Sequence, residues 1–252
     1  MSTVGEIYKV LDQWAPFSTA ESFDNSGLLI GGMEQPVSFC LLALDLTQAV
    51  CEEAAERGAQ LVITHHPVIF DPLRRVDAES VVYNAVQAGI AVISTHTCMD
   101  KAHGGVSDVL AEKLGLIQVE DLPGGEGFVK IGEPEELVNG LDLARSVKEK
   151  LGLGALRVYD AGFLVRKAAV CSGSGGSFLK EVIAAGADAY ITGDIKHDVV
   201  VSAANAGLTL IDAGHYETEE IILEPIAKYL EKRFPEVQFE RAKTDEPLFR
   251  QL

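Results

Sequence analysis

Two adjacent histidines follow an apolar run in the first third of the chain. The stretch is "LVITHHPVIF", residues 61–70, in which Pro67 comes directly after His65 and His66. Neutral imidazole nitrogens are common metal ligands, but neighbouring side chains of a strand point to opposite faces. Both rings can reach one site only if the chain leaves strand geometry, which proline favours because it cannot continue a hydrogen-bonded ladder. The alternative, that each ring binds a different metal ion, stays open.

A second pair of metal-binding side chain types occurs towards the C-terminus, in the stretch "GHYETEE". His215 and Glu219 are four residues apart there. If a helix begins at this point, both side chains project from one face, one turn apart, and can chelate a divalent ion. The alternative is an acidic cluster that complements the helix dipole, which would explain the glutamates but not the histidine.

A third group of such side chains lies in "STHTCMDKAHGGVSD", just after a predicted strand. Asp100 carries a carboxylate that can bind one ion or bridge two. His96, at the strand end, is a candidate ligand, a hydrogen-bond donor to a ligand, or a catalytic proton carrier. Cys98 is a possible soft ligand, but we expect it to be an inert packing thiol, because a lone buried thiol usually is. His103, beside two glycines, is more often a loop residue than a ligand.

The combined donor set exceeds the three protein ligands of a typical catalytic zinc ion. We therefore predict two divalent transition-metal ions per chain. Mixed nitrogen and oxygen donors suit Zn, Mn, Fe, Co or Ni without selecting among them. Two ions can lower the pKa of a bridging water and clamp the attacked oxygen. The predicted ligands are His65, His66, Asp100, His215 and Glu219.

Two further segments are candidates for substrate binding. The Gly/Ser turn in "AAVCSGSGGSFLKEV" has backbone N–H groups that can hold a phosphate at a helix N-terminus, although a plain tight turn is the alternative. In "ITGDIKHD", Lys196 can attract an anionic substrate and His197 can carry a proton, unless both lie in a solvated loop. The turn residues that we consider for phosphate binding are Gly173, Ser174, Gly175 and Gly176.

The elements that must position these residues share one layout. In four segments a helical pattern ends at a glycine, a short apolar strand follows, and His, Asp or Glu comes at or just after the strand end. Helices that alternate with strands indicate an α/β fold with mainly parallel sheets. Ligands bind at the carboxyl ends of such strands. The four glycines are Gly58, Gly89, Gly186 and Gly207.

The layout occurs twice, near residues 37–115 and again near 163–232, with a strand–helix–strand pattern between them. We expect two similar α/β halves, residues 1–124 and 125–252, with one compact unit as the alternative. No Pro/Ser-rich linker marks the boundary.

Composition excludes several classes of protein. The formal net charge of −17 gives no basic footprint for nucleic acid or anionic lipid. The four cysteines have no C-x-x-C or disulfide-framework spacing, which indicates a reducing compartment. No signal peptide and no apolar run of membrane-spanning length occurs. We predict a cytoplasmic protein without a membrane partner.

The motifs resemble those of one known family. "ESFDNSGLLIG", "ITHHPVIF", "GSGGS", "TGDIKHD" and "DAGHYETE" follow in the order found in the Nif-three-like dinuclear metal-centre family, from about Glu21 to Glu219. Members are often labelled type 2 homologues of GTP cyclohydrolase I. The resemblance implies a Nif-three-like fold, in which two halves face a shared metal-binding cleft that holds the five predicted ligands. It also implies a homohexamer, built as a trimer of dimers, and the short form without an inserted domain.

Two functions fit these features. In the first, the protein is a metal-dependent hydrolase in which a metal-activated water attacks a nucleotide-like substrate. If that substrate is GTP, as the resemblance implies, hydroxide attacks C8 of the guanine and formate leaves, while His96 or His197 carries protons. In the second, the protein binds metal but catalyses no reaction, and it acts in regulation or in metal handling. A ring that encircles nucleic acid is disfavoured by the negative charge.

Overall fold

A computed structural model describes residues 1–249 of the chain, which form two compact α/β units. The first unit comprises Met1–His103 and Ile222–Leu248, and the second comprises Gly104–Ile221. The chain therefore crosses between units twice, rather than once after residue 124 as expected. The reason is that the C-terminal strand, β13 (Gln238–Arg241), pairs in parallel with β2 (Phe39–Ala43) of the first unit.

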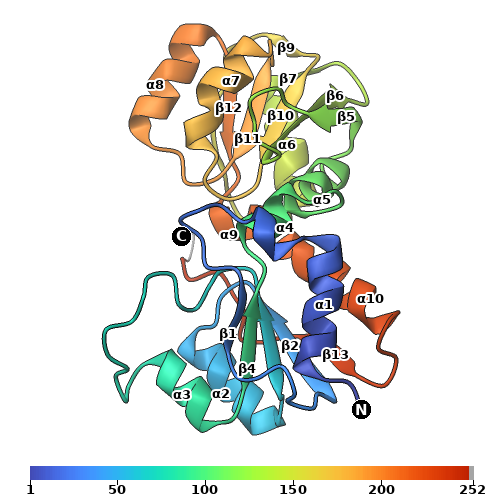
Figure 1. Ribbon diagram of the computed structural model, residues 1–252. Coiled ribbons are helices and arrows are strands. Elements are labelled where there is room, and N and C mark those ends of the chain that lie inside the picture. The colour runs from blue at the N-terminus through green and yellow to red at the C-terminus, as the bar shows by residue number, and fades with distance from the viewer. Residues whose placement is uncertain (250–252) are drawn as a thin grey trace. The chain divides into compact units, whose positions relative to one another are not determined.

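The first unit has a five-stranded sheet in the order β1-β4-β3-β2-β13, in which only β1 runs antiparallel to its neighbour. Helices α2 and α3 lie against one face, and α1 and α10 against the other (Figure 1). The remaining strands are β1 (Gly27–Ile30), β3 (Leu61–Thr64) and β4 (Ala91–Ser94). The helices are α1 (Val4–Trp14), η1 (Phe17–Thr19), α2 (Gln48–Arg57), α3 (Val81–Gln87), α4 (Thr97–Lys101) and α10 (Leu223–Glu231).

The second unit has a six-stranded sheet in the order β5-β6-β10-β11-β12-β8, which is parallel only at its centre, β10-β11-β12. Apolar side chains of α5 and α6 form one core on it, and those of α7 and α8 form another. The strands are β5 (Leu116–Asp121), β6 (Val129–Pro134), β8 (Arg157–Tyr159), β10 (Ala168–Cys171), β11 (Ala189–Thr192) and β12 (Thr209–Asp212), with a separate pair β7 (Val138–Asn139) and β9 (Leu164–Val165). The helices are α5 (Val106–Lys113), α6 (Gly140–Lys150), η2 (Gly176–Phe178), α7 (Leu179–Ala184), α8 (His197–Ala206), α9 (His215–Glu219) and η3 (Glu220–Ile222).

The predicted alternation of helices and strands is confirmed. Strands β3, β4, β11 and β12 each follow a helix that ends before a glycine. Gly58 and Gly207 cap two of these helices with φ of 71° and 69°, the left-handed conformation that a residue with a Cβ adopts only at a cost. The expected strand–helix–strand segment also forms, but β6 and β8 join the second sheet instead of standing apart. Within residues 1–249 no helix is long and apolar enough to cross a bilayer.

Glu53 of α2 links this helix to the C-terminal segment of the first unit by hydrogen bonds. Its carboxylate accepts hydrogen bonds from the backbone N–H and the hydroxyl of Thr244, both at 2.9 Å, and from Nη1 of Arg57 at 2.7 Å. Burial raises the pKa of Glu53, but these bonds and one from the Lys243 backbone outweigh burial and lower it to about 2. The ionised form therefore stabilises the fold.

We expect Glu53→Gln to lower the free energy of unfolding by about 1–3 kcal/mol at neutral pH, because charged hydrogen bonds are lost. A carboxyl with a lowered pKa stabilises the protein above its unfolded value, near 4.5, and this stabilisation disappears as the pH falls towards about 2. The deficit of the variant should shrink over that range in urea unfolding curves. The control is Glu56→Gln, an exposed carboxylate on the same helix. A deficit that is constant with pH would contradict this role of the charge.

Candidate metal centre

The chain leaves regular strand geometry at the paired histidines. Strand β3 ends at Thr64, and the successive N–H groups of His65 and His66 both donate to carbonyls of the same neighbouring segment, at Ala43 (3.3 Å) and Leu44 (3.0 Å). In a regular ladder, consecutive N–H groups would point to opposite sides. The two rings consequently lie side by side, with centroids 5.0 Å apart. The expected departure from strand geometry is present.

Each of the two rings is oriented through its Nδ1 atom. Nδ1 of His65, which is completely buried, lies 3.0 Å from the carbonyl oxygen of Thr95. Nδ1 of His66 lies 2.9 Å from a carboxylate oxygen of Asp45. With the proton on Nδ1, each ring donates to this oxygen and presents the lone pair of Nε2. This arrangement is typical of metal-binding histidines, because the second bond fixes the tautomer and raises the basicity of the ligand nitrogen.

His96 completes a cluster of three imidazoles in the first unit. It precedes α4, and its ring centroid lies 5.4 Å from that of His65 and 5.5 Å from that of His66. One ligand nitrogen from each of the three rings lies within 4.8 Å of the others. The predicted proton carrier thus sits among the predicted ligands, where it can bind an ion or move a proton.

Asp24 positions His96 and was not singled out in the sequence. Its carboxylate lies 2.9 Å from Nδ1 of His96 and accepts hydrogen bonds from the hydroxyls of Thr97 (2.6 Å) and Ser26 (2.8 Å). Burial raises the pKa of Asp24, but the hydrogen bonds and the nearby imidazole outweigh it and hold this pKa well below its ordinary value. A fixed negative charge therefore orients the ring. The two residues are 72 positions apart, so no local spacing links them.

Asp100, the predicted carboxylate ligand, is buried in α4 with Oδ1 3.5 Å from Nε2 of His65. Cys98 on the same helix is also buried, and burial raises the pKa of its thiol to about 11. Because only the thiolate is a strong ligand, the expectation of an inert thiol fits this environment. His103 is exposed, and its carbonyl accepts a hydrogen bond of 3.0 Å from the indole of Trp14.

In the second unit, helix α9 begins at His215 as the motif predicted. His215 Nε2 lies 3.0 Å from Oε2 of Glu219, so both side chains project from one face of the helix. Its Nδ1 lies 2.8 Å from a carboxylate oxygen of Asp194, which follows β11. The second unit therefore repeats the carboxylate–histidine arrangement of the first. Asp194, like Asp24, was not predicted as a positioning residue.

The Gly/Ser turn packs against this helix. The N–H of Gly173 donates to the hydroxyl of Thr218 at 2.9 Å, and a Cβ on Gly173 would lie only 2.0 Å from Oε1 of Glu219. Its φ of +58° also favours glycine. The N–H of Gly175 donates to Thr192 at 2.8 Å. Two N–H groups of the turn are thus bonded within the protein, and phosphate binding at Gly173–Gly176 stays a prediction.

Lys196 and His197 lie at the beginning of α8, and both are exposed. They follow Asp194, the residue that holds His215. Their predicted roles, attraction of an anionic substrate and proton transfer, stay predictions.

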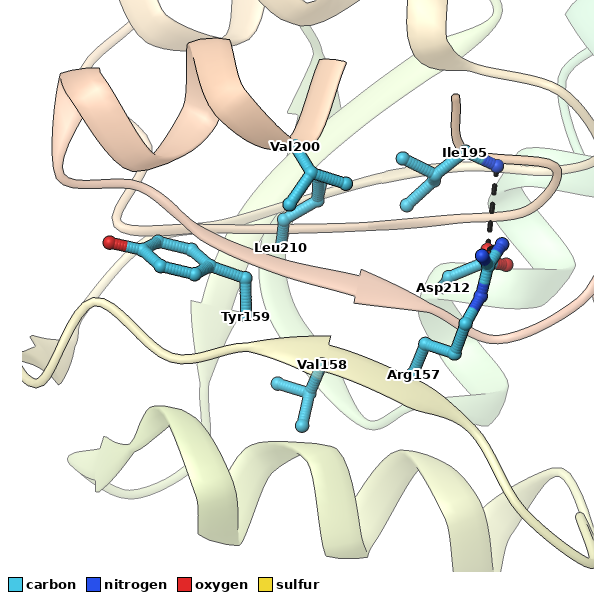
Figure 2. Close-up of a pocket in the computed structure, with 7 residues that line it drawn as sticks. All are labelled: Arg157, Val158, Tyr159, Ile195, Val200, Leu210 and Asp212. Atoms are coloured by element: carbon cyan, nitrogen blue, oxygen red, sulfur yellow. Dashed lines mark hydrogen bonds and ion pairs between the residues drawn. The ribbon is translucent and has the colours of Figure 1, made fainter. Parts of the chain in front are cut away.

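A pocket of about 190 Å³ lies in the second unit, lined by Arg157, Val158, Tyr159, Ile195, Val200, Leu210 and Asp212 (Figure 2). None of these residues is a predicted ligand. Asp212 is mostly buried and is ion-paired with Arg157. It also accepts hydrogen bonds from the N–H groups of Ile195 (3.4 Å) and Gly214 (3.3 Å), which neighbour Asp194 and His215. Asp212 therefore joins the two segments that carry the candidate ligand and its partner.

The residues present fit divalent metal ions. The first unit offers three imidazoles and a carboxylate, and the second offers an imidazole and a carboxylate on one turn of helix. Such mixed donors suit first-row transition metals. The hydrogen bonds at the Nδ1 atoms fix the orientation of the histidine rings, as in known metal sites.

Comparisons with known proteins identify relatives of this chain. The family described as Duf34/NIF3 (NGG1p interacting factor 3) matches residues 2–247. Proteins named "GTP cyclohydrolase 1 type 2 homolog" are similar: one from Clostridium perfringens is 30% identical over 91% of this chain and 92% of its own length. One from Campylobacter jejuni is 33% identical over 90% and 91%. A crystal structure of a Bacillus cereus protein related to NIF3 has the same fold, with a TM-score of 0.92, 23% identity and 99% of each chain covered.

Proposed function

The chain belongs to the Duf34/NIF3 family, and on that basis we propose that it is a metal-dependent hydrolase that uses two divalent ions on a nucleotide-like substrate. The observation that carries this proposal is the cluster of His65, His66 and His96 beside the buried Asp100. Each of the three imidazoles has an Nδ1 that is oriented by an oxygen atom, an arrangement that suits metal ligands.

We propose that the ions are bound by His65, His66 and Asp100 of the first unit and by His215 and Glu219 of the second. Neither set alone provides the ligands that two ions require. When bound, such ions lower the pKa of water and polarise a substrate oxygen.

The chain's own residues have separate tasks in this reaction. Asp24 stabilises a proton on Nδ1 of His96, so that Nε2 of His96 can accept a proton from the nucleophile and return it to the leaving group. His197 can carry a second proton, since it is exposed at the start of α8. Lys196, next to it, attracts an anionic substrate, and the turn Gly173–Gly176 holds phosphate.

GTP is the first substrate to test, because the relatives are named as homologues of a GTP cyclohydrolase. Protein loaded with Zn²⁺, Mn²⁺, Fe²⁺, Co²⁺ or Ni²⁺ should release formate or phosphate from GTP or from a panel of other nucleotides. Asp100→Asn should reduce turnover by at least about 100-fold, since it removes a charged group from the donor set. Glu34→Gln, an exposed carboxylate elsewhere in the first unit, should leave turnover unchanged.

Turnover that survives Asp100→Asn would contradict the assignment of this carboxylate. A protein that binds stoichiometric metal but turns over no nucleotide would instead favour non-catalytic metal binding, in regulation or metal handling.

We also propose that the chain assembles as a homohexamer, a trimer of dimers, in the cytoplasm. The sequence resemblance supports the assembly, and four buried free cysteines are compatible with a reducing compartment. Light scattering of the purified protein measures the mass of the assembly.

A further inference from the structure

Two large aromatic side chains are exposed next to the histidine cluster of the first unit. Phe23 is 62% exposed and Phe70 is 46% exposed, although hydrophobic rings of this size are usually buried. Their ring centroids lie 6.4 Å apart, and the Phe70 ring meets the His96 ring edge-on at 6.3 Å. The two phenyl rings therefore lie next to the imidazole cluster and are exposed to solvent.

Hydrogen bonds fix the chain on both sides of this pair. The side-chain amide of Asn25 donates to the carbonyl of Ile69 at 2.6 Å, which joins the neighbours of the two phenylalanines. Asp24, directly after Phe23, is bonded to His96 and Thr97. The backbone that carries the two phenylalanines is consequently fixed next to the imidazoles before any ligand arrives. Such preorganisation reduces the entropy that binding costs.

We propose that Phe23 and Phe70 form a stacking surface for a planar heterocyclic ring of the substrate, such as a purine base. This inference rests on the proposed function, and it names the part of the substrate that lies beside the metal ligands. A phenyl ring stacks on any base, because every base has a π-face, whereas ribose and phosphate have none. The two rings are tilted by 38° to each other, and each is partly exposed to a flat apolar ligand.

Guanosine and ribose 5-phosphate are the probes that test this proposal with the full, metal-loaded chain. Guanosine carries the ring, and ribose 5-phosphate lacks it. We expect Phe23→Leu and Phe70→Leu each to weaken guanosine binding by about tenfold in calorimetry. Phe70→Trp should retain affinity. Metal content and the binding of ribose 5-phosphate should not change. The control is Phe163→Leu, which removes a ring of similar exposure (68%) from the second unit and should have no effect.

Three results would overturn the proposal. The first is the absence of measurable guanosine binding to the wild type. The second is unchanged guanosine affinity in both leucine variants. The third is a change of assembly mass in both leucine variants, since the rings would then be covered by a second copy of the chain.

Metal analysis and formate release, both measured on the wild type, distinguish failure of the stacking proposal from failure of the proposed function. Suppose that the wild type has neither bound metal nor turnover, but that the two leucine variants bind guanosine more weakly. The hydrolase would then be refuted, and the stacking surface would be supported. If the protein binds metal and is active, but both substitutions leave its guanosine affinity unchanged, the hydrolase is supported and the stacking surface is refuted.

Discussion

Replacing His65 with alanine is expected to remove most of the transition metal from the purified protein. The ring is completely buried, its Nδ1 is bonded to Thr95, and its Nε2 lies 3.5 Å from Asp100. A water molecule that enters the gap would lack both the basicity and the fixed position of this nitrogen. Since losing even a supporting hydrogen bond costs about 10–100-fold in metal affinity, losing the ligand should cost at least about 100-fold.

Elemental analysis after gel filtration measures this loss, with circular dichroism as a check on folding. Because a buried cavity can destabilise the protein, His66→Ala is the second variant; that ring is partly exposed, so less packing is lost. The control is His103→Ala, which changes an exposed histidine outside the cluster. Near-stoichiometric metal in both cluster variants would exclude a centre at the end of β3.

The strand-end histidines could be predicted because their causes are local. A glycine that ends a helix and a short apolar run are both visible in a window of about a dozen residues. Parallel strands then bring successive carboxyl ends to the same edge of the sheet, so His65 after β3 and His96 after β4 become neighbours. The i, i+4 spacing of His215 and Glu219 works in the same way within one helix.

The contacts that support the rings could not be predicted, because they depend on tertiary structure. Asp24 reaches His96 across 72 positions, and nothing in either motif specifies the other. The same holds for Phe23 and Phe70, which are 47 positions apart and whose neighbours Asn25 and Ile69 are joined by a hydrogen bond. The return of β13 to the first sheet also escaped prediction, since the choice of a neighbouring strand is made by the whole unit.

Gly193 shows how closely the second unit packs behind its candidate ligands. The glycine follows β11, and its N–H donates to the carbonyl of Gly173 at 2.7 Å. A Cβ at this position would lie 2.6 Å from the carbonyl carbon of Gly214 and 2.7 Å from the nitrogen of His215. Both are backbone atoms, so no side-chain rotation can relieve the overlap. The absence of a side chain therefore allows two backbone segments to touch.

We expect Gly193→Ala to destabilise the protein by about 1–3 kcal/mol, the usual cost of overpacking, and to lower metal affinity by at least about tenfold. The added methyl must push the segment after β11 away from His215, which breaks the 2.8 Å contact between Asp194 and Nδ1 of His215. Thermal unfolding and metal titration measure the two effects. Gly32→Ala is the matched control, because its Cβ would meet nothing within 4 Å. If the two variants behaved alike, the contact of Gly193 with Gly214 would not position the ligand, and the orientation of His215 would depend on Asp212 and Asp194 alone.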